Sequence, residues 1–250
     1  GSNPTIARRL ESMFERVTLQ AVNSINTIGS ESAPAITLQT HVTYLNGGAA
    51  FDTLDFMAPA LIGVFVFLFV FILTSISFLR ERIAGTLERL QATPIKPLEI
   101  IIGYMMGFLL FGLLQGLITL LYTVFVLDIN YTGNLLNVFI VEILLVITSV
   151  NLGIFMSTFA HNEFQVLQFI PLVVVTQVFL GGMLWEVEDM PAWLQPIAQV
   201  MPLTHATRAL RDIMIKGASL STEWASLLAL VVIGSVVILL SARTAGRVRL

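Results

Sequence analysis

The sequence predicts an all-α integral membrane protein, a bundle of five transmembrane helices, and two observations carry this prediction. The first is composition: 56% of the 250 residues are hydrophobic, 12% are charged, and the mean hydropathy is +0.87, whereas soluble domains contain about 25% charged residues. The second is a set of continuous apolar runs that reach the roughly 20 residues a helix needs to cross a bilayer. Because these runs do not alternate as barrel strands do, they predict helices.

The predicted spans occupy about residues 56–79, 100–127, 135–160, 164–185 and 224–242, within a transmembrane domain covering residues 55–250. Only the third span contains a charged residue, Glu142. The chain has no cysteine and a net charge of −3, so disulfides and thiolate metal sites are excluded and nothing indicates a nucleic-acid partner. No arrangement of side chains indicates a catalytic site, and we expect neither a cofactor nor a metal in this chain.

Positive charge in the short loops predicts the orientation of the bundle. Lys and Arg gather in the link between the first two spans and in the tail after the fifth, at Arg80, Arg82, Arg89, Lys96, Arg243, Arg247 and Arg249. With five spans these regions share one side, which we expect to be the cytoplasmic side of the cell (inner or plasma) membrane. The N-terminal end of the chain would then lie outside. Arg208, Arg211 and Lys216 fall on the unfavoured side, in a longer link where the rule is weaker.

Residues 1–54 are more polar and are expected to be the C-terminal remnant of an extracytoplasmic segment. Asn3 and Pro4 are typical of a helix start, apolar residues recur at helical spacing within 6–28, and Thr37–Leu45 alternates loosely as a strand would. An amphipathic helix lying on the membrane surface is the alternative. An odd number of spans with an outward N-terminus favours an additional upstream span, which would make a native subunit of six spans.

The most polar feature of the transmembrane domain is the segment that links the first two spans. Ile83, Leu87 and Leu90 are spaced as one apolar stripe of a helix, with charged residues on the remaining surface. Thr93-Pro94 should end this helix, because a residue before proline disfavours the α region. The pattern predicts a short amphipathic helix over about residues 80–91. A helix that merely lies on the lipid headgroups is the alternative reading.

The sequence of this segment, RERIAGTLERLQATPIKPLEI from Arg80 to Ile100, resembles the signature of ABC-2 type transporter permeases. In that family a similar stretch joins the second and third spans of a six-span subunit. The resemblance continues in PLTHATRALR at residues 202–211 and in Gly181-Gly182, and it covers about residues 55–250. The chain departs from the family in lacking the first span, in its short outer segment, and in Tyr104, which stands where many members have Lys.

The resemblance implies a coupling helix that contacts a separate ATP-binding cassette subunit, with contact residues Arg80, Glu81, Arg82, Gly85, Thr86, Leu87 and Glu88. It also implies an outer gate that contains Gly181, Gly182, Pro202 and Arg211. The chain has no Gly-x-x-x-x-Gly-Lys-Ser/Thr phosphate loop, so ATP and Mg²⁺ are expected on the partner subunit. A second copy of this chain or a homologous permease, membrane lipid, and a hydrophobic small-molecule substrate are the other expected partners.

The sequence predicts two further elements, one on the cytoplasmic side and one on the outer side. The tight turn of His161, Asn162 and Glu163 is expected to make a second cytoplasmic contact; three adjacent residues in a turn rarely chelate a metal. Short outer helices over about residues 191–215 are expected to form a lid, with Leu203, Ala206, Leu210, Ile213 and Met214 on one face.

Small and polar residues inside the spans leave two questions open. Two small-x-x-x-small pairs in the second span, Gly103, Gly107, Gly112 and Gly116, indicate close helix packing, either within the chain or between two copies. Glu142 would lie roughly 10 Å deep at a rise of 1.5 Å per residue. It could serve as a cation site, a proton relay or a contact to a cationic drug. Alternatively it is a structural glutamate, protonated or hydrogen-bonded to Asn151, Gln115 or Gln177.

The favoured function is the permease subunit of an ATP-driven exporter for a hydrophobic or amphipathic substrate such as a drug or lipid. One alternative is an ion-coupled secondary transporter or channel that uses Glu142. The other is a non-transporting membrane anchor that recruits a soluble protein.

Overall fold

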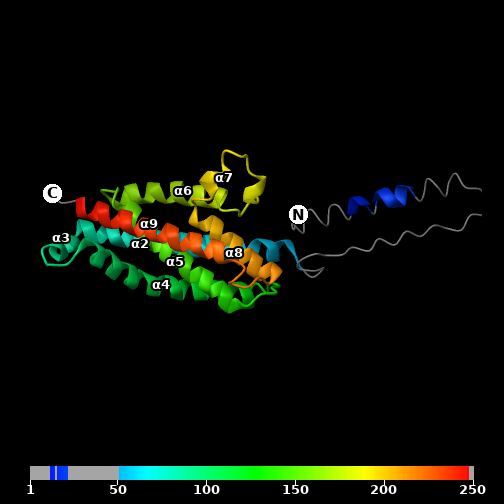
Figure 1. Cartoon of the computed structure of the whole chain (residues 1–250), viewed down its shortest axis with the longest axis horizontal. Helices are drawn as coiled ribbons and strands as arrows, with labels where there is room; N and C mark the ends of the chain where they lie inside the picture. The colour runs from blue at the N-terminus through cyan, green and yellow to red at the C-terminus, as the bar shows by residue number, and fades with distance from the viewer. Residues whose placement is uncertain (1–11, 15, 22–50, 248–250) are drawn as a thin grey trace, which may run out of the picture.

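The computed structural model describes residues 12–14, 16–21 and 51–247, and within them every regular element is helical. Five long apolar helices confirm the predicted spans (Figure 1). They are α2 (Thr53–Ile83), α4 (Pro97–Phe125), α5 (Leu135–Ser157), α6 (Glu163–Leu180) and α9 (Trp224–Arg247). Four short helices complete the bundle: α3 (Thr86–Gln91), the 3-10 helix η1 (Val187–Asp189), α7 (Gln195–Ala198) and α8 (Pro202–Lys216).

Most of the N-terminal segment lies outside the described residues. The predicted helix start at Asn3-Pro4 and the predicted strand Thr37–Leu45 fall there, so both stay predictions. Residues 12–14 and 16–21 are helical, as the apolar spacing predicts.

The predicted helix over residues 80–91 is wrong as a single element. The first span continues as α2 to Ile83, and a break at Ala84-Gly85 separates it from α3. The backbone N–H groups of Ala84 and Gly85 donate to the carbonyls of Arg80 (2.9 Å) and Arg82 (3.1 Å), and Gly85 adopts a φ of +72°. Glycine enters this left-handed region at little cost, because it has no Cβ atom. The apolar stripe through Ile83 and the later leucines therefore crosses a helix end.

Other predicted boundaries differ for similar local reasons. The fourth span ends at Leu180 rather than Trp185, because the chain turns at Gly181-Gly182, where Gly182 has a φ of +74°. The predicted outer helix that starts near residue 191 shortens to α7, whereas α8 extends to Lys216 and buries the predicted apolar face.

The bundle has two ends. Here the α3 end comprises residues 84–96, residues 158–162 and the end of α9, and the α8 end comprises residues 126–134 and 181–223. Figure 1 shows α3 and the end of the red helix α9 at one end of the long axis. Charged and polar loops occupy both ends, while the spans between them are apolar.

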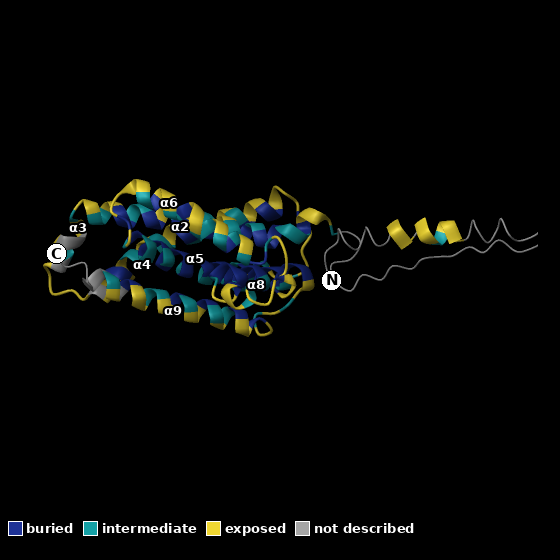
Figure 2. Cartoon of the chain, turned by 90° about the horizontal axis from the view of Figure 1, so that it is seen from above, coloured by how far each residue is buried: buried dark blue, intermediate teal, exposed yellow. Residues whose placement is uncertain are grey.

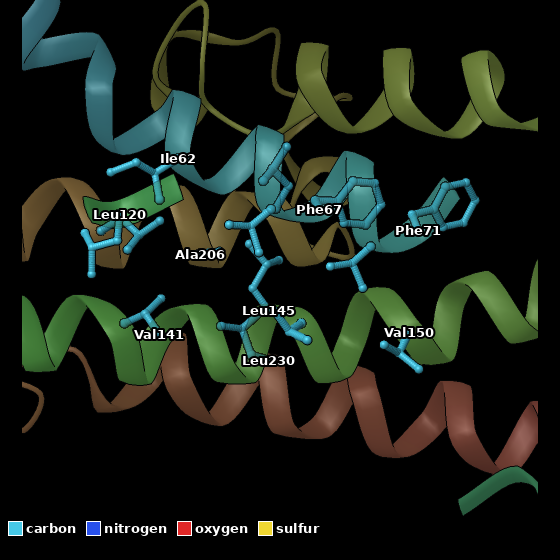
Figure 3. Packing of buried hydrophobic residues seen from close by; sticks show 14 of the residues in the cluster. Ile62, Phe67, Phe71, Leu120, Val141, Leu145, Val150, Ala206 and Leu230 are labelled. Carbon is cyan, nitrogen blue, oxygen red and sulfur yellow. The ribbon is translucent and has the colours of Figure 1, made fainter. Parts of the chain in front are cut away.

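Helices α2 and α5 form the core. In their most apolar stretches 56% and 61% of the residues are buried, against 28%, 17% and 22% for α4, α6 and α9, so the outer three helices face mostly outward (Figure 2). Figure 3 shows Phe67 and Phe71 of α2 and Leu145 and Val150 of α5 packed in the space between the helices. Helix α5 also contacts α4, α8 and α9, which makes it the central helix.

Glycines allow the closest helix approaches. A Cβ atom on Gly153 of α5 would lie 3.1 Å from the carbonyl oxygen of Phe71 on α2. On α4, a Cβ atom on Gly112 would lie 2.4 Å from Cγ1 of Val146, and one on Gly116 would lie 3.1 Å from Oε2 of Glu142. The second small-x-x-x-small pair of α4 therefore packs within the chain, as interfaces of apolar helices require. Gly103 and Gly107, by contrast, have open space where a Cβ would be.

Two glycine substitutions on the same helix test this packing. Gly112→Ala should lower the stability of the bundle in detergent by about 1–3 kcal/mol, because the added methyl displaces Val146 in a filled core. Gly107→Ala, the matched control, should leave stability unchanged or raise it by up to about 1 kcal/mol through helix propensity. Thermal unfolding of the purified chain measures both. Equal losses from the two variants would contradict the assignment of Gly112 to internal packing.

Candidate functional site

The loop between α2 and α4 forms an exposed, defined projection at the α3 end. Helix α3 begins directly after Gly85, whose carbonyl accepts from the backbone N–H of Arg89 (3.3 Å). The backbone N–H and the hydroxyl of Thr93 both donate to the carbonyl of Leu90, at 3.1 and 2.5 Å, which closes the turn after α3. The backbone N–H of Lys96 then donates to the carboxylate of Glu99 (2.9 Å) at the start of α4. Local hydrogen bonds thus shape the whole projection.

Most residues of this projection are exposed. Thr86 of the predicted contact set is among them. The side chains of Leu87 and Glu88 lie outside the described part of the structure, so their predicted contact role stays a prediction.

The first three residues of the predicted contact set each pair with a different helix of the bundle. Arg80 donates from Nε and Nη2 to the two carboxylate oxygens of Glu163 at the start of α6, at 2.8 and 3.3 Å. The carboxylate of Glu81 accepts from the hydroxyl of Tyr104 on α4 at 3.3 Å. We call Arg80, Glu81 and Arg82 together the α2 collar.

The third member of the α2 collar reaches the end of α5. Nη1 of Arg82 donates to the carbonyl of Ser157 at 2.5 Å and lies 3.4 Å from the carbonyl of Ala160. The last carbonyls of a helix have no partner within the helix, and a cation suits the negative end of its dipole. Arg82 is half-buried there, so it joins the end of α2 to the end of the central helix.

The turn of His161, Asn162 and Glu163 lies beside the α2 collar, as the ion pair to Arg80 shows. Asn162 is the N-cap of α6, and its side chain accepts from the backbone N–H of Gln165 at 2.9 Å. The backbone N–H of His161 donates to the side chain of Gln165 at 2.7 Å. Among the described residues there is no group of three or more potential metal ligands. The structure thus brings both predicted cytoplasmic contacts together at one end.

The predicted outer-gate residues also come together, at the α8 end. The buried guanidinium of Arg211 donates to the carbonyl of Gly182 at 3.1 Å and lies 4.7 Å from the ring centre of Phe56. Burial lowers the pKa of Arg211, and the charges of Glu186 and Asp212 oppose this effect.

The start of α8 is fixed against the end of α6 at the same place. Pro202 is its first residue and is buried. A Cβ atom on Gly181 would lie 3.0 Å from the side chain of Leu203. The side-chain oxygen of Gln177 accepts from the backbone N–H of Leu203 (3.3 Å), and the hydroxyl of Thr204 donates to the carbonyl of Leu180 (3.0 Å).

Sequence reasoning missed a polar junction at the α8 end. The buried carboxylate of Asp55, in the first turn of α2, accepts from the backbone N–H and the side-chain amide of Asn130, at 2.9 and 3.1 Å. The hydroxyl of Thr132 donates to the carbonyl of Ile215 at 2.9 Å, and its backbone N–H donates to that of Met214 at 2.8 Å. An acidic residue at the very start of an apolar run was the available signal.

The predicted hydrogen-bond partners of Glu142 are wrong. Its side chain is fully buried, and neither carboxylate oxygen has a partner within the described part of the chain. Gln115 donates to the carbonyl of Phe65 (3.5 Å) and to Thr119 (3.2 Å), Asn151 donates to the carbonyl one turn earlier (2.8 Å), and Gln177 pairs with α8. Asn151 thus bonds to its own backbone, as short polar side chains on helices often do, while Gln115 and Gln177 bond to α2 and α8 rather than to Glu142.

Comparison with known proteins yields one family and several relatives. The sequence model of the ABC-2 type transporter family matches residues 13–215. ABC transporter G family member 20 of Dictyostelium discoideum is 30% identical over 181 residues, which is 72% of this chain and 24% of that protein.

Two Escherichia coli proteins are named as probable multidrug ABC transporter permeases. YbhR is 30% identical over 178 residues (71% of this chain, 48% of YbhR), and YbhS is 25% identical over 219 residues (87% of this chain, 57% of YbhS). The chain therefore spans less than two thirds of the length of these relatives.

Two arginines of α8, Arg208 and Arg211, should contribute very differently to the stability of the bundle. Arg211→Ala should lower the stability by about 2–3 kcal/mol, because the carbonyl of Gly182 and the ring of Phe56 lose a buried partner. Arg208→Ala, the control, should cost about 1 kcal/mol or less, because its ion pair with Glu188 is exposed (41% and 66% for the two side chains). Thermal unfolding in detergent compares them, and a loss of Arg211 as mild as that of Arg208 would refute the role of Arg211.

Proposed function

Because the chain belongs to the ABC-2 type transporter family, we propose that it is the membrane subunit of an ATP-driven exporter and works with a separate ATP-binding subunit. Five apolar helices make it a multi-pass membrane protein. The exposed projection at the α3 end carries the proposal, because it is a hydrogen-bonded polar helix and turn that lie outside the apolar bundle and can contact a soluble partner. The chain contains no phosphate-binding loop, so ATP and Mg²⁺ are assigned to the partner subunit.

The Lys and Arg residues of the short loop between α2 and α4 support a cytoplasmic α3 end. The three cations of the α8 end are each engaged: Arg208 pairs with Glu188, Lys216 with Asp212 at 2.5 Å, and Arg211 with the carbonyl of Gly182. Arg89 and Lys96, by contrast, project from the exposed loop at the α3 end. This arrangement supports a cell-membrane protein with its α3 end and C-terminus in the cytoplasm and its α8 end outside.

The outer surfaces of α4, α6 and α9 are consistent with two further proposals: that a second permease subunit packs against this one, and that the transported molecule is apolar. These helices expose large hydrophobic side chains along most of their length, which suits contact with lipid and with a second permease subunit. A drug-like or lipid-like molecule is the cargo we propose, in keeping with the multidrug names of YbhR and YbhS.

Reconstitution tests the proposed function. The chain, in its full native form, should co-purify with an ATP-binding subunit from native membranes. In inside-out vesicles that hold both, a fluorescent hydrophobic dye should accumulate only when ATP is supplied. If no hydrophobic compound changes the ATPase rate of the partner subunit, the result would instead support a membrane anchor that recruits a soluble protein.

The positive φ of Gly85 predicts that docking of the ATP-binding subunit depends on this residue. Gly85→Pro should abolish co-purification with the ATP-binding subunit, because proline cannot adopt a φ of +72° and removes the N–H that bonds to Arg82. Gly85→Asn is the matched control, since asparagine tolerates the left-handed region, and it should bind nearly as well as glycine. Circular dichroism and size-exclusion chromatography check that both bundles remain folded. Retained binding by a folded Gly85→Pro variant would refute the docking role.

One observation favours ion-coupled transport as a second candidate function. Glu142 is buried, and no described residue hydrogen-bonds to its carboxylate; intramembrane carboxylates often mark ion or proton paths. For an ion-coupled transporter, liposomes that contain this chain alone should move the dye in response to an ion gradient, and Glu142→Gln should abolish that movement. For an ATP-driven exporter, no ATP-independent movement is expected from either form.

A further inference from the structure

We propose that the α2 collar is the junction through which a displacement of the exposed projection moves α4, α5 and α6 together. This inference rests on the proposed function, since it assigns the force to an ATP-binding subunit. It makes Arg80, Glu81 and Arg82 positioning residues inside the permease, in place of the partner contact that the family resemblance implies for them, and leaves docking to the exposed surface of the projection.

The placement of the collar follows from helix geometry. Successive residues of an α-helix point about 100° apart, so three in a row face three directions around α2. Each direction meets a different helix: Arg80 reaches α6, Glu81 reaches α4, and Arg82 reaches the end of α5. The last turn of α2 is therefore tied on several sides.

The collar also lies directly before the break at Gly85. The projection leaves the bundle at that point and returns at Lys96, and the bond from Tyr104 to Glu81 ties its two bases together. A push on α3 thus acts on two helix ends that are already joined. Tyr104 supplies the donor opposite Glu81.

The three contacts differ in strength. The pair of Arg80 and Glu163 is bidentate but exposed (66% and 50% for the side chains), and exposed pairs contribute little in water. Arg82 is half-buried, and its acceptors are carbonyls at the end of the central helix. Because α5 contacts α2, α4, α8 and α9, Arg82 links the base of the projection to the central helix of the bundle.

The test separates coupling from docking. Arg82→Ala should still co-purify with the ATP-binding subunit, but the dye transported per ATP hydrolysed should fall at least about five-fold, the size of a typical coupling between sites. Arg82→Lys, which keeps a donor, should recover part of this ratio. Arg89→Ala, on the exposed surface of α3, should weaken co-purification instead. Loss of co-purification by Arg82→Ala, or an unchanged transport ratio, would overturn the proposal.

A charge exchange tests the α6 arm of the collar. Arg80→Glu should lower the transport ratio, and adding Glu163→Arg should restore it, because the pair is re-formed with reversed charges. A defect that does not depend on this ion pair would not be repaired by the second change. Failure of the double variant to improve on Arg80→Glu would remove α6 from the junction.

A distance measurement keeps the collar testable if no ATP-binding subunit is found. The chain has no cysteine, so cysteines at Ile95 and Phe164, both exposed, can carry two spin labels. In the unaltered chain the distance between labels should be narrowly distributed, and Arg82→Ala with Arg80→Ala should broaden it. If no ATP-binding subunit co-purifies but the double variant still broadens the distance distribution, the proposed function is refuted while the collar remains a mechanical junction. An unchanged distribution overturns the junction itself.

Discussion

The close packing of α5 against α2 is the constraint on which the rest of the structure depends. Both helices are mostly apolar along their spans, and lipid solvates such surfaces as well as another helix does, so hydrophobicity alone cannot hold them together. The contact instead relies on shape: Gly153 brings the backbone of α5 to that of Phe71, and phenylalanines of α2 fill the adjoining space. The remaining helices attach to this pair, α4 through Gly112 and Gly116 and α8 through its buried apolar face.

Polar contacts complement this packing where the helices meet the bundle ends. Asp55 joins α2 to the loop after α4 at the α8 end, and the α2 collar joins α2 to its neighbours at the α3 end. Each of these contacts uses a helix terminus or a loop, where backbone groups lack partners within a helix. The middle of the bundle is therefore held mainly by close packing, with only long inter-helix hydrogen bonds such as Gln115 to Phe65 (3.5 Å) among the described residues. The two ends are held by shorter hydrogen bonds, so substitutions in the middle and at the ends should have different consequences.

The sequence predicted the parts of the molecule that depend on length and periodicity. Five spans follow from apolar runs, and the buried face of α8 follows from helical spacing, because each property belongs to one segment alone. The single helix over residues 80–91 was wrong because spacing does not register a glycine at positive φ. The partners of Glu142 were also wrong, because side chains such as Asn151 bond within their own helix. Contacts such as Tyr104 to Glu81 join separate helices, and periodicity within one helix carries no information about its neighbour.

The narrow buried stripe of α6 has a consequence for the order in which the bundle can come apart. Only Val166, Ile170 and Gln177 of its 18 residues are buried, so displacing α6 uncovers less interior surface than displacing any other span. Its attachments are concentrated at its two ends, at Glu163 and at Gln177. Regions with few buried contacts open at the lowest free-energy cost. Helix α6 is thus the span whose departure leaves the α2–α5 pair most nearly intact, and a lateral opening of the bundle would begin there.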